Sequence, residues 1–339
     1  MTNGEPPPEV TSLKADKTSP VCPDETVKFE ATTSPPSATV TWEVAVDGGE
    51  PHAVEGDGNT LEISGFGQTM KVTASLTNSR SETVTWKVAD LQINVPPGPD
   101  NGRYVITDEP RMPVITGTAI FEGGSGTVSG WEVSVDFRAD DCPPFGPKDL
   151  TTSFKFSPNG GNEVTTDSFG SVVRGGDIGF LAKGTVDGCS VTGFGGAGLV
   201  GTNPQRTDVQ ASLPHHTLQR IACRESGQRQ FDAPPDGGTA FCPLFGPGGK
   251  VGVMQIANPT DDEVWNWRLN VAKGIEIFNQ RVDAATAYPG EVEDSDKFKS
   301  LVSQFNQKRQ AQGLNPIQVV VPPRRKTLSV RSALPPRWN

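Results

Sequence analysis

The chain lacks any run of eighteen apolar residues, which excludes a membrane-spanning helix within its 339 residues. Positive charge is also scarce, because 30 Lys and Arg face 40 Asp and Glu and leave a formal net charge of −10. This acidic balance argues against nucleic acid or an anionic lipid surface as the main partner. Residues 1–8 have neither a basic region nor an apolar core, so we expect no secretory signal there.

Tyrosine is nearly missing, with two Tyr against 38 Gly and 30 Pro. Such a composition is typical of loop-rich proteins and unlike that of a helical bundle. A chain of this length usually holds two or three domains. The Pro-rich residues 1–9 have no packing potential and are predicted to form a disordered leader.

Residues 10–94 are predicted to form an immunoglobulin-like β-sandwich. Apolar and polar residues alternate over 26–32 and 38–44, as expected for strands with one buried face. Similar short segments follow, separated by turn residues, and about five to seven short strands are the signature of this fold. Trp42, in the expected third strand, is predicted to pack in the core.

A second β-sandwich is predicted over residues 103–204. The Pro- and Gly-rich residues 95–102 break the strand pattern and predict a linker between the two sandwiches. Alternating segments then recur, at 113–119, 131–137, 153–156 and 179–186. The density of Gly in this region predicts long turns or bulges.

The pattern changes to helix after Pro204. Leu218, Ile221 and Ala222 recur at helical spacing and predict a short amphipathic helix, for which Gly227 is the expected stop. Glu225 then lies at the negative end of the helix dipole, which disfavours its charged form. That environment suits a general acid working near neutral pH. A solvated Glu on a helix end is the alternative, and position alone does not decide between the two.

Further helices are predicted downstream. Thr260 and Glu263 have the spacing of a capping box, which predicts a helix through Trp265 and Trp267. Apolar spacing predicts helices over 270–282 and 294–312, and the second should end at Gly313. Residues 316–339 are predicted to be an extended tail.

Three segments, in this order, resemble those of the lytic transglycosylases and goose-type lysozymes. They are Glu225-Ser226 at a helix end, the run from Gly252 to Gln255, and Asn270 with Gly274. A fourth, around Tyr288, is similar to an Ala-Tyr-Asn-Ala/Gly element of the family but has Pro289 in place of Asn. The resemblance implies a mainly α, lysozyme-like domain over residues 209–315.

The resemblance also implies roles for individual residues. Glu225 would be the single acid that protonates the glycosidic oxygen, as glycan cleavage requires. Ser226, Gln255 and Tyr288 would bind or position the sugar, and Met254 would wall the cleft, with ordinary core packing as its equal alternative. Four carboxylates are available as a second group, and the sequence does not choose among them: Asp232, Asp236, Asp261 and Asp262. No cofactor or metal is implied.

Five cysteines occur, and we predict two disulfides, Cys142–Cys189 and Cys223–Cys242, because each pair falls within one expected domain. Such bonds imply an oxidising compartment, the periplasm or outside. The alternatives are free thiols, or a zinc site formed by Cys223, Cys242, His215 and His216, which lacks a paired Cys-x-x-Cys. Cys142 and Cys242 each open a Cys-Pro-x-Phe-Gly-Pro hexapeptide, so this sequence occurs twice in the chain.

The sequence therefore predicts a multidomain protein with two all-β immunoglobulin-like sandwiches followed by a mainly α lysozyme-like domain. The expected function is cleavage of the MurNAc–GlcNAc glycan strand of peptidoglycan outside the cytoplasm. The expected partners are the glycan strands, a phage-tail or secretion-machine component that delivers the protein, and a cognate inhibitor. The alternative is a non-catalytic wall-binding or adhesin-like structural protein.

Overall fold

The computed structural model describes residues 7–64, 69–76, 81–141, 150–232 and 242–321. The chain divides into two compact units. The first is mostly β and holds residues 1–106, 111–138 and 151–200. The second contains the helical C-terminal region from residue 201 onward, together with residues 107–110 and 139–150.

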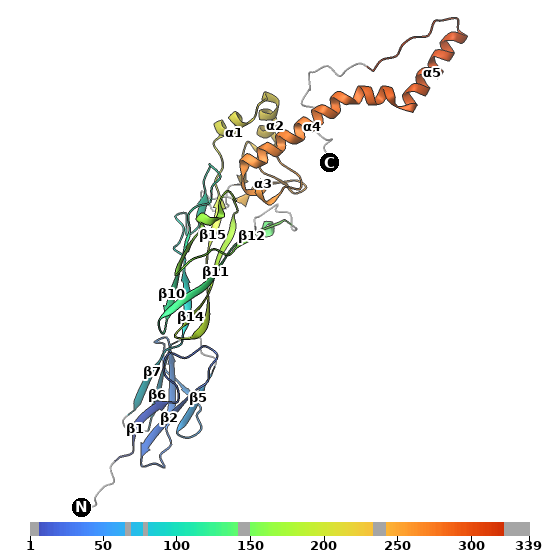
Figure 1. Cartoon of the computed structure of the whole chain (residues 1–339). Helices are drawn as coiled ribbons and strands as arrows, with labels where there is room; N and C mark the ends of the chain where they lie inside the picture. The colour runs from blue at the N-terminus through green and yellow to red at the C-terminus, as the bar shows by residue number, and fades with distance from the viewer. Residues whose placement is uncertain (1–6, 65–68, 77–80, 142–149, 233–241, 322–339) are drawn as a thin grey trace, which may run out of the picture. The chain divides into compact units, whose positions relative to one another are not determined.

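The first unit begins with a seven-stranded sandwich (blue in Figure 1). Its two antiparallel sheets have the strand orders β1-β2-β5 and β4-β3-β6-β7. The strands are β1 (Glu9–Ala15), β2 (Val27–Ser34), β3 (Thr41–Val46), β4 (His52–Val54), β5 (Thr60–Ile63), β6 (Met70–Ser75) and β7 (Glu82–Trp86). Along β2 every second residue is buried, as the alternation predicts. Trp42 lies on β3 and is 2 % exposed, which confirms its place in the core.

The second sandwich repeats this strand order. Its sheets are β8-β10-β13 and β12-β11-β14-β15, with β9 added beside β15. The strands are β8 (Asp90–Asn94), β9 (Tyr104–Ile106), β10 (Thr116–Glu122), β11 (Gly126–Arg138), β12 (Thr151–Phe156), β13 (Glu163–Thr165), β14 (Gly176–Val186) and β15 (Cys189–Gly201). Short 3-10 turns, η1 (Ala139–Asp141) and η2 (Thr166–Phe169), follow β11 and β13. Immunoglobulin-like sandwiches are thus present twice.

The junction between the sandwiches lies earlier than the sequence predicts. Residues 90–94 are predicted to belong to the first sandwich, but they form β8, which pairs with β10 of the second. The expected linker at 95–102 instead forms a turn inside the second sandwich, where Gly98 pairs with Gly102. Only three residues, 87–89, separate β7 from β8.

Glycine in the second sandwich does more than form turns. The Cβ atoms that Gly193 and Gly195 lack would lie 2.4 Å from the carbonyl oxygens of Leu91 and Ile93. These two positions of β15 therefore let β8 approach its backbone closely. Our expectation of turns and bulges alone overlooked this, because close approach between strands leaves no local sequence signal.

A disulfide joins Cys22 to Cys189, with a Cα–Cα distance of 5.1 Å and a sequence separation of 167. The predicted Cys142–Cys189 bond is therefore wrong, and Cys142 itself lies outside the described residues. The reason is the early junction: Val21 pairs with Val88 directly before β8, which brings Cys22 beside the first residue of β15. The assumption that each disulfide stays within one domain failed here.

In the part that the structure describes, the second unit contains five α-helices and four two-residue strands. The helices are α1 (Arg206–Ser212), α2 (His216–Ser226), α3 (Asp261–Trp265), α4 (Trp267–Asp294) and α5 (Asp296–Ala311). The short strands pair as β16 (Phe231–Asp232) with β17 (Cys242–Pro243), and β18 (Phe245–Gly246) with β19 (Lys250–Val251). A buried apolar cluster joins α1, α2 and the first turns of α4 to the segment after β19, and includes Leu218, Ala222, Met254, Trp267 and Val271. None of the helices in the described part of the chain is long and apolar enough to cross a membrane.

The capping box is present, since the Thr260 hydroxyl accepts from Glu263 N–H and the Glu263 carboxylate accepts from Thr260 N–H. The helix after it ends at Trp265, and Asn266 caps a new helix, α4. α4 runs to Asp294, well beyond the predicted end at residue 282, and includes Pro289. α5 lies within two residues of its predicted ends.

Replacing Cys22 or Cys189 with Ser should lower the free energy of unfolding of the first unit by about 2 to 5 kcal/mol, because an open chain gains entropy when it unfolds. Chemical denaturation followed by tryptophan fluorescence measures this. Cys223→Ser is the matched control, since Cys223 is an exposed free thiol. Destabilisation by Cys223→Ser alone would contradict this pairing.

Candidate functional site

Glu225 is the penultimate residue of α2 and its side chain is exposed. Gly227 ends the helix as predicted, because it adopts φ +66° and its N–H donates to the carbonyls of Ala222 and Cys223. Leu218, Ala222 and Ser226 recur at four-residue intervals and are all buried. The helix therefore turns its buried side to the core and leaves Glu225 in solvent.

Ser226 is buried, and its hydroxyl donates to the Val253 carbonyl at 2.7 Å. The same oxygen lies 3.0 Å from the Ala222 carbonyl, one turn back along α2. Of the two roles expected for Ser226, positioning fits this geometry better than sugar binding. The contact joins the helix end that carries Glu225 to the turn at residues 251–256.

That turn has an irregular backbone. Gly252 and Gln255 both have positive φ, +76° and +48°, and Val251 and Ile256 pair across the turn. The Gln255 side chain is buried and its amide donates to the Gly252 carbonyl at 3.0 Å. Gln255 therefore stabilises its own turn, and this arrangement does not hold its amide out toward solvent.

Asn270, on α4, holds the turn from the other side. Its side-chain oxygen accepts from Met254 N–H at 2.9 Å, and its amide donates to the carbonyls of Val251 (3.0 Å) and Glu263 (3.2 Å). Asn270 is fully buried. One turn further along α4, a Cβ on Gly274 would lie 2.5 Å from Met254 Cγ, so glycine leaves room for that side chain.

Met254 is 8 % exposed and belongs to the buried apolar cluster, which favours core packing over a cleft wall.

Lys273 lies between Asn270 and Gly274 in the chain and forms an ion pair with Glu276. Its pKa is raised because its ammonium donates a hydrogen bond to that carboxylate at 2.8 Å and is attracted by its charge.

The three segments of the resemblance contact one another through Ser226, Met254 and Asn270, as the hydrogen bonds above show.

Gln230 completes the arrangement, and our sequence reasoning missed it. Its side chain is fully buried, accepts from Val253 N–H at 3.1 Å, and donates to the carbonyl of Val264 at 2.8 Å. A Cβ on Gly252 would lie 2.4 Å from its Oε1. No periodicity or motif singles out the glutamine directly before β16, so the sequence carried no signal for it.

Tyr288 is not brought to this site. It lies on α4, fourteen residues beyond Gly274, which corresponds to roughly 21 Å along a helix. It is 54 % exposed, and it sits within a continuous helix where the resemblance implied a separate element.

Of the candidate second carboxylates, Asp232 pairs with Arg229 at 3.3 Å, and Asp261 and Asp262 lie in the first turn of α3. Asp236 lies outside the described residues.

The predicted Cys223–Cys242 disulfide is wrong. Cys223 follows the buried Ala222 on α2, so it points outward, and its thiol is free. Cys242 is disulfide-bonded, which also removes it as a thiolate ligand and contradicts the zinc alternative. Within the described ranges no group of three or more His, Cys, Asp or Glu side chains could hold a metal ion.

No protein-family model matches the chain, and comparison with curated protein sequences gives no match. Among solved structures it is similar to fibronectin(III)-like modules of Clostridium thermocellum CbhA, with 14 % identity, 54 % of this chain and 93 % of that chain covered, and a TM-score of 0.18. The ectodomain of mouse nectin-like molecule 4 is 9 % identical over 57 % of this chain and 65 % of that chain, with a TM-score of 0.26. The chicken CNTN1 FN1-FN3 domains are 12 % identical over 57 % and 66 %, with a TM-score of 0.26. These neighbours consist of immunoglobulin-like and fibronectin-type domains.

Two glycines of α4 provide a test of the packing around Met254. Gly274→Ala should lower the free energy of unfolding by about 1 to 3 kcal/mol, because its Cβ overlaps Met254 in a packed core. Gly290→Ala, in open space on the same helix, should instead raise it by up to about 1 kcal/mol through helix propensity. Thermal unfolding followed at a helix signal measures both. Shifts of the same sign would contradict the close approach at Gly274.

Proposed function

We propose that this protein cleaves the glycan strands of peptidoglycan, as a lytic transglycosylase or muramidase, with Glu225 as the general acid. The supporting observation is that the three segments resembling such enzymes contact one another in three dimensions. Ser226 bonds to Val253, and Asn270 bonds to Met254. Segments that matched by chance would have no reason to meet.

The chemistry requires a proton donor at the leaving oxygen and stabilisation of the oxocarbenium-like transition state. Glu225 is exposed, so a glycan strand can reach it, and the Ser226 contact fixes the helix end on which it stands. The turn at residues 251–256, beside the end of α2, is held by buried hydrogen bonds. A general acid must be held in position, and these bonds support the position of Glu225. The substrate's own N-acetyl group, or an activated water, would complete the reaction. If the N-acetyl group does so, a single acid suffices.

The remaining parts of the proposal concern the setting. The Cys22–Cys189 disulfide is consistent with an oxidising, extracytoplasmic compartment. In this proposal the two sandwiches act as adaptors, and a phage tail or secretion machine delivers the protein to the wall. A cognate inhibitor would then protect the producing cell. The competing proposal is a wall-binding or adhesin-like protein, favoured by Tyr288 lying fourteen residues beyond Gly274 on α4 and by the two sandwiches.

Digestion of purified peptidoglycan tests the proposal. The intact protein should release soluble muropeptides, and Glu225→Gln should reduce release by at least about a hundredfold, as removal of a general acid does. Glu291→Gln, which changes another exposed Glu of the helical unit, is the matched control and should retain full activity. Mass spectrometry of the products separates 1,6-anhydro ends from hydrolysed reducing ends.

Sedimentation with intact sacculi, measured on the same three proteins, distinguishes the two proposals. If none of them releases products while all of them sediment with sacculi, the catalytic proposal fails and the binding proposal stands. Binding to whole cells by residues 1–200 alone would further assign adhesion to the sandwiches. Release by Glu225→Gln at the intact rate would remove Glu225 from the mechanism.

A further inference from the structure

Helix α5 has an apolar surface that does not join the buried cluster of the described residues. All four buried residues of α4 lie in its first eight positions, and α5 has no buried residue among its sixteen. Helices in proteins are stabilised mainly by packing an apolar face rather than by intrinsic propensity. A helix of this length that buries none of its own residues needs a surface to pack against.

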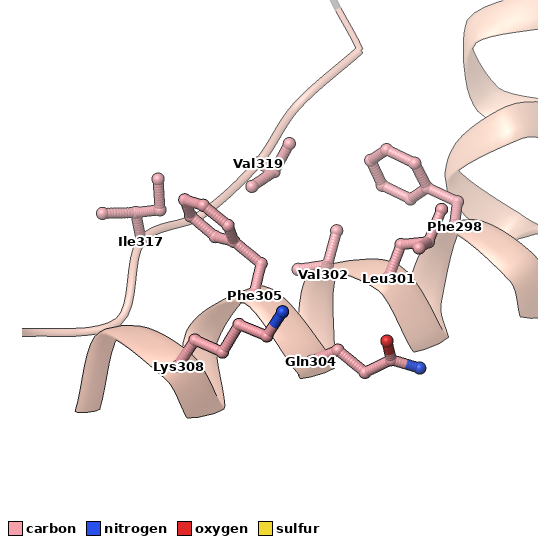
Figure 2. Close-up of a pocket in the computed structure, with 8 residues that line it drawn as sticks. All are labelled: Phe298, Leu301, Val302, Gln304, Phe305, Lys308, Ile317 and Val319. Atoms are coloured by element: carbon pink, nitrogen blue, oxygen red, sulfur yellow. The ribbon is translucent and has the colours of Figure 1, made fainter. Parts of the chain in front are cut away.

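The apolar residues of α5 line a groove of about 640 Å³. Phe298, Val302 and Phe305 project from the helix toward the extended residues that follow it, which carry Ile317 and Val319 (Figure 2). The groove stays open to solvent, since Leu301 is 55 %, Phe305 46 % and Ile317 43 % exposed. A concave apolar surface of this kind is typical of a docking site.

The extended wall of the groove is held in place by specific hydrogen bonds. Asn306 both donates to the Ile317 carbonyl (3.0 Å) and accepts from Ile317 N–H (2.9 Å). Arg309 Nε donates to the Asn315 carbonyl at 2.9 Å. Val321 N–H donates to the Glu293 carboxylate at 2.8 Å. The groove is therefore a built feature of the fold and not a loose end of the chain.

We propose that this groove is a self-association surface, which pairs α5 with α5 of a second copy in antiparallel orientation. The apolar stripe, Phe298, Leu301, Val302 and Phe305, is symmetrical about the midpoint between Leu301 and Val302. A two-fold interface requires that if one residue contacts a second, the second contacts the first on the other copy. This stripe meets that requirement: Phe298 faces Phe305 of the second copy, and Leu301 faces Val302.

The charges around the stripe have the matching polarity. The turn between α4 and α5 is acidic, because its two lysines, Lys297 and Lys299, are outnumbered by four carboxylates, Glu291, Glu293, Asp294 and Asp296. The other end of α5 is basic, with Lys308 and Arg309. In the antiparallel pair each acidic end, with Asp294 as the last residue of α4, meets the basic end of the other copy, where Lys308 lines the groove. A parallel pair would place like charges together, which disfavours it.

Sedimentation equilibrium of the full chain from low to high micromolar concentration tests the proposal. We expect a dimer at the upper end. Leu301→Glu should weaken the dimer at least tenfold in Kd, because it places a charge in the centre of the apolar stripe. Gln307→Glu is the matched control, since it adds the same charge on the opposite side of α5 and should change Kd less than twofold. Circular dichroism of each variant verifies that the helices are retained.

Charge reversal tests the antiparallel orientation. Asp294→Lys and Lys308→Asp should each weaken the dimer severalfold, and the chain carrying both should recover most of that loss. A double variant as weak as the single ones would overturn the antiparallel pairing. A wild-type chain that stays monomeric at every concentration would overturn self-association. If a chain ending at Val321 then dimerised while the full chain did not, the groove would be assigned to the chain's own last residues. Glycan cleavage is assayed separately, so neither result depends on Glu225.

Discussion

The side chain of Asn270 is the contact on which the candidate site depends. The turn at residues 251–256 contains two positive φ angles and cannot satisfy its backbone groups in a regular strand pairing. Buried backbone groups need partners, and an unpaired one costs about 1 to 3 kcal/mol. Asn270 makes two side-chain hydrogen bonds to the backbone of the turn and Gln230 makes a third, so two buried amides replace the missing ladder. Removing either amide would leave donors and acceptors buried without partners.

This arrangement determines where Glu225 stands. Ser226 attaches the end of α2 to Val253, and Asn270 attaches the next residue of the turn to α4. Gly252 and Gly274 are needed because a Cβ at either position would overlap the side chains that make these contacts possible. The residues around Glu225 thus determine its position. The apolar cluster on which they pack keeps water away from their hydrogen bonds.

Local patterns predicted much of this fold. Period-two alternation found strands such as β2 and β3 of the first sandwich but neither β1 nor β4, and the capping box and Gly227 located the start of α3 and the end of α2. Features set by distant parts of the chain were not predictable in the same way. The partner of Cys189 depends on where one sandwich ends and the next begins, and close packing at Gly193 depends on a strand one hundred residues away. Gln230 bonds to backbone groups of Val253 and Val264 that no motif describes.

The helical unit also depends on a segment that precedes most of the second sandwich in the chain. Residues 107–110 belong to this unit, where the Asp108 carbonyl accepts from Trp267 Nε1 at 2.6 Å and Glu109 pairs with Arg268 at 2.8 Å. Trp267 and Arg268 open α4, three and two residues before Asn270. Because the ion pair is exposed, it adds little, whereas the buried indole, 1 % exposed, fixes the start of the helix. The position of Asn270 beside the turn is therefore set by a segment far away in sequence. A domain boundary drawn at residue 209 omits this part of the site's support.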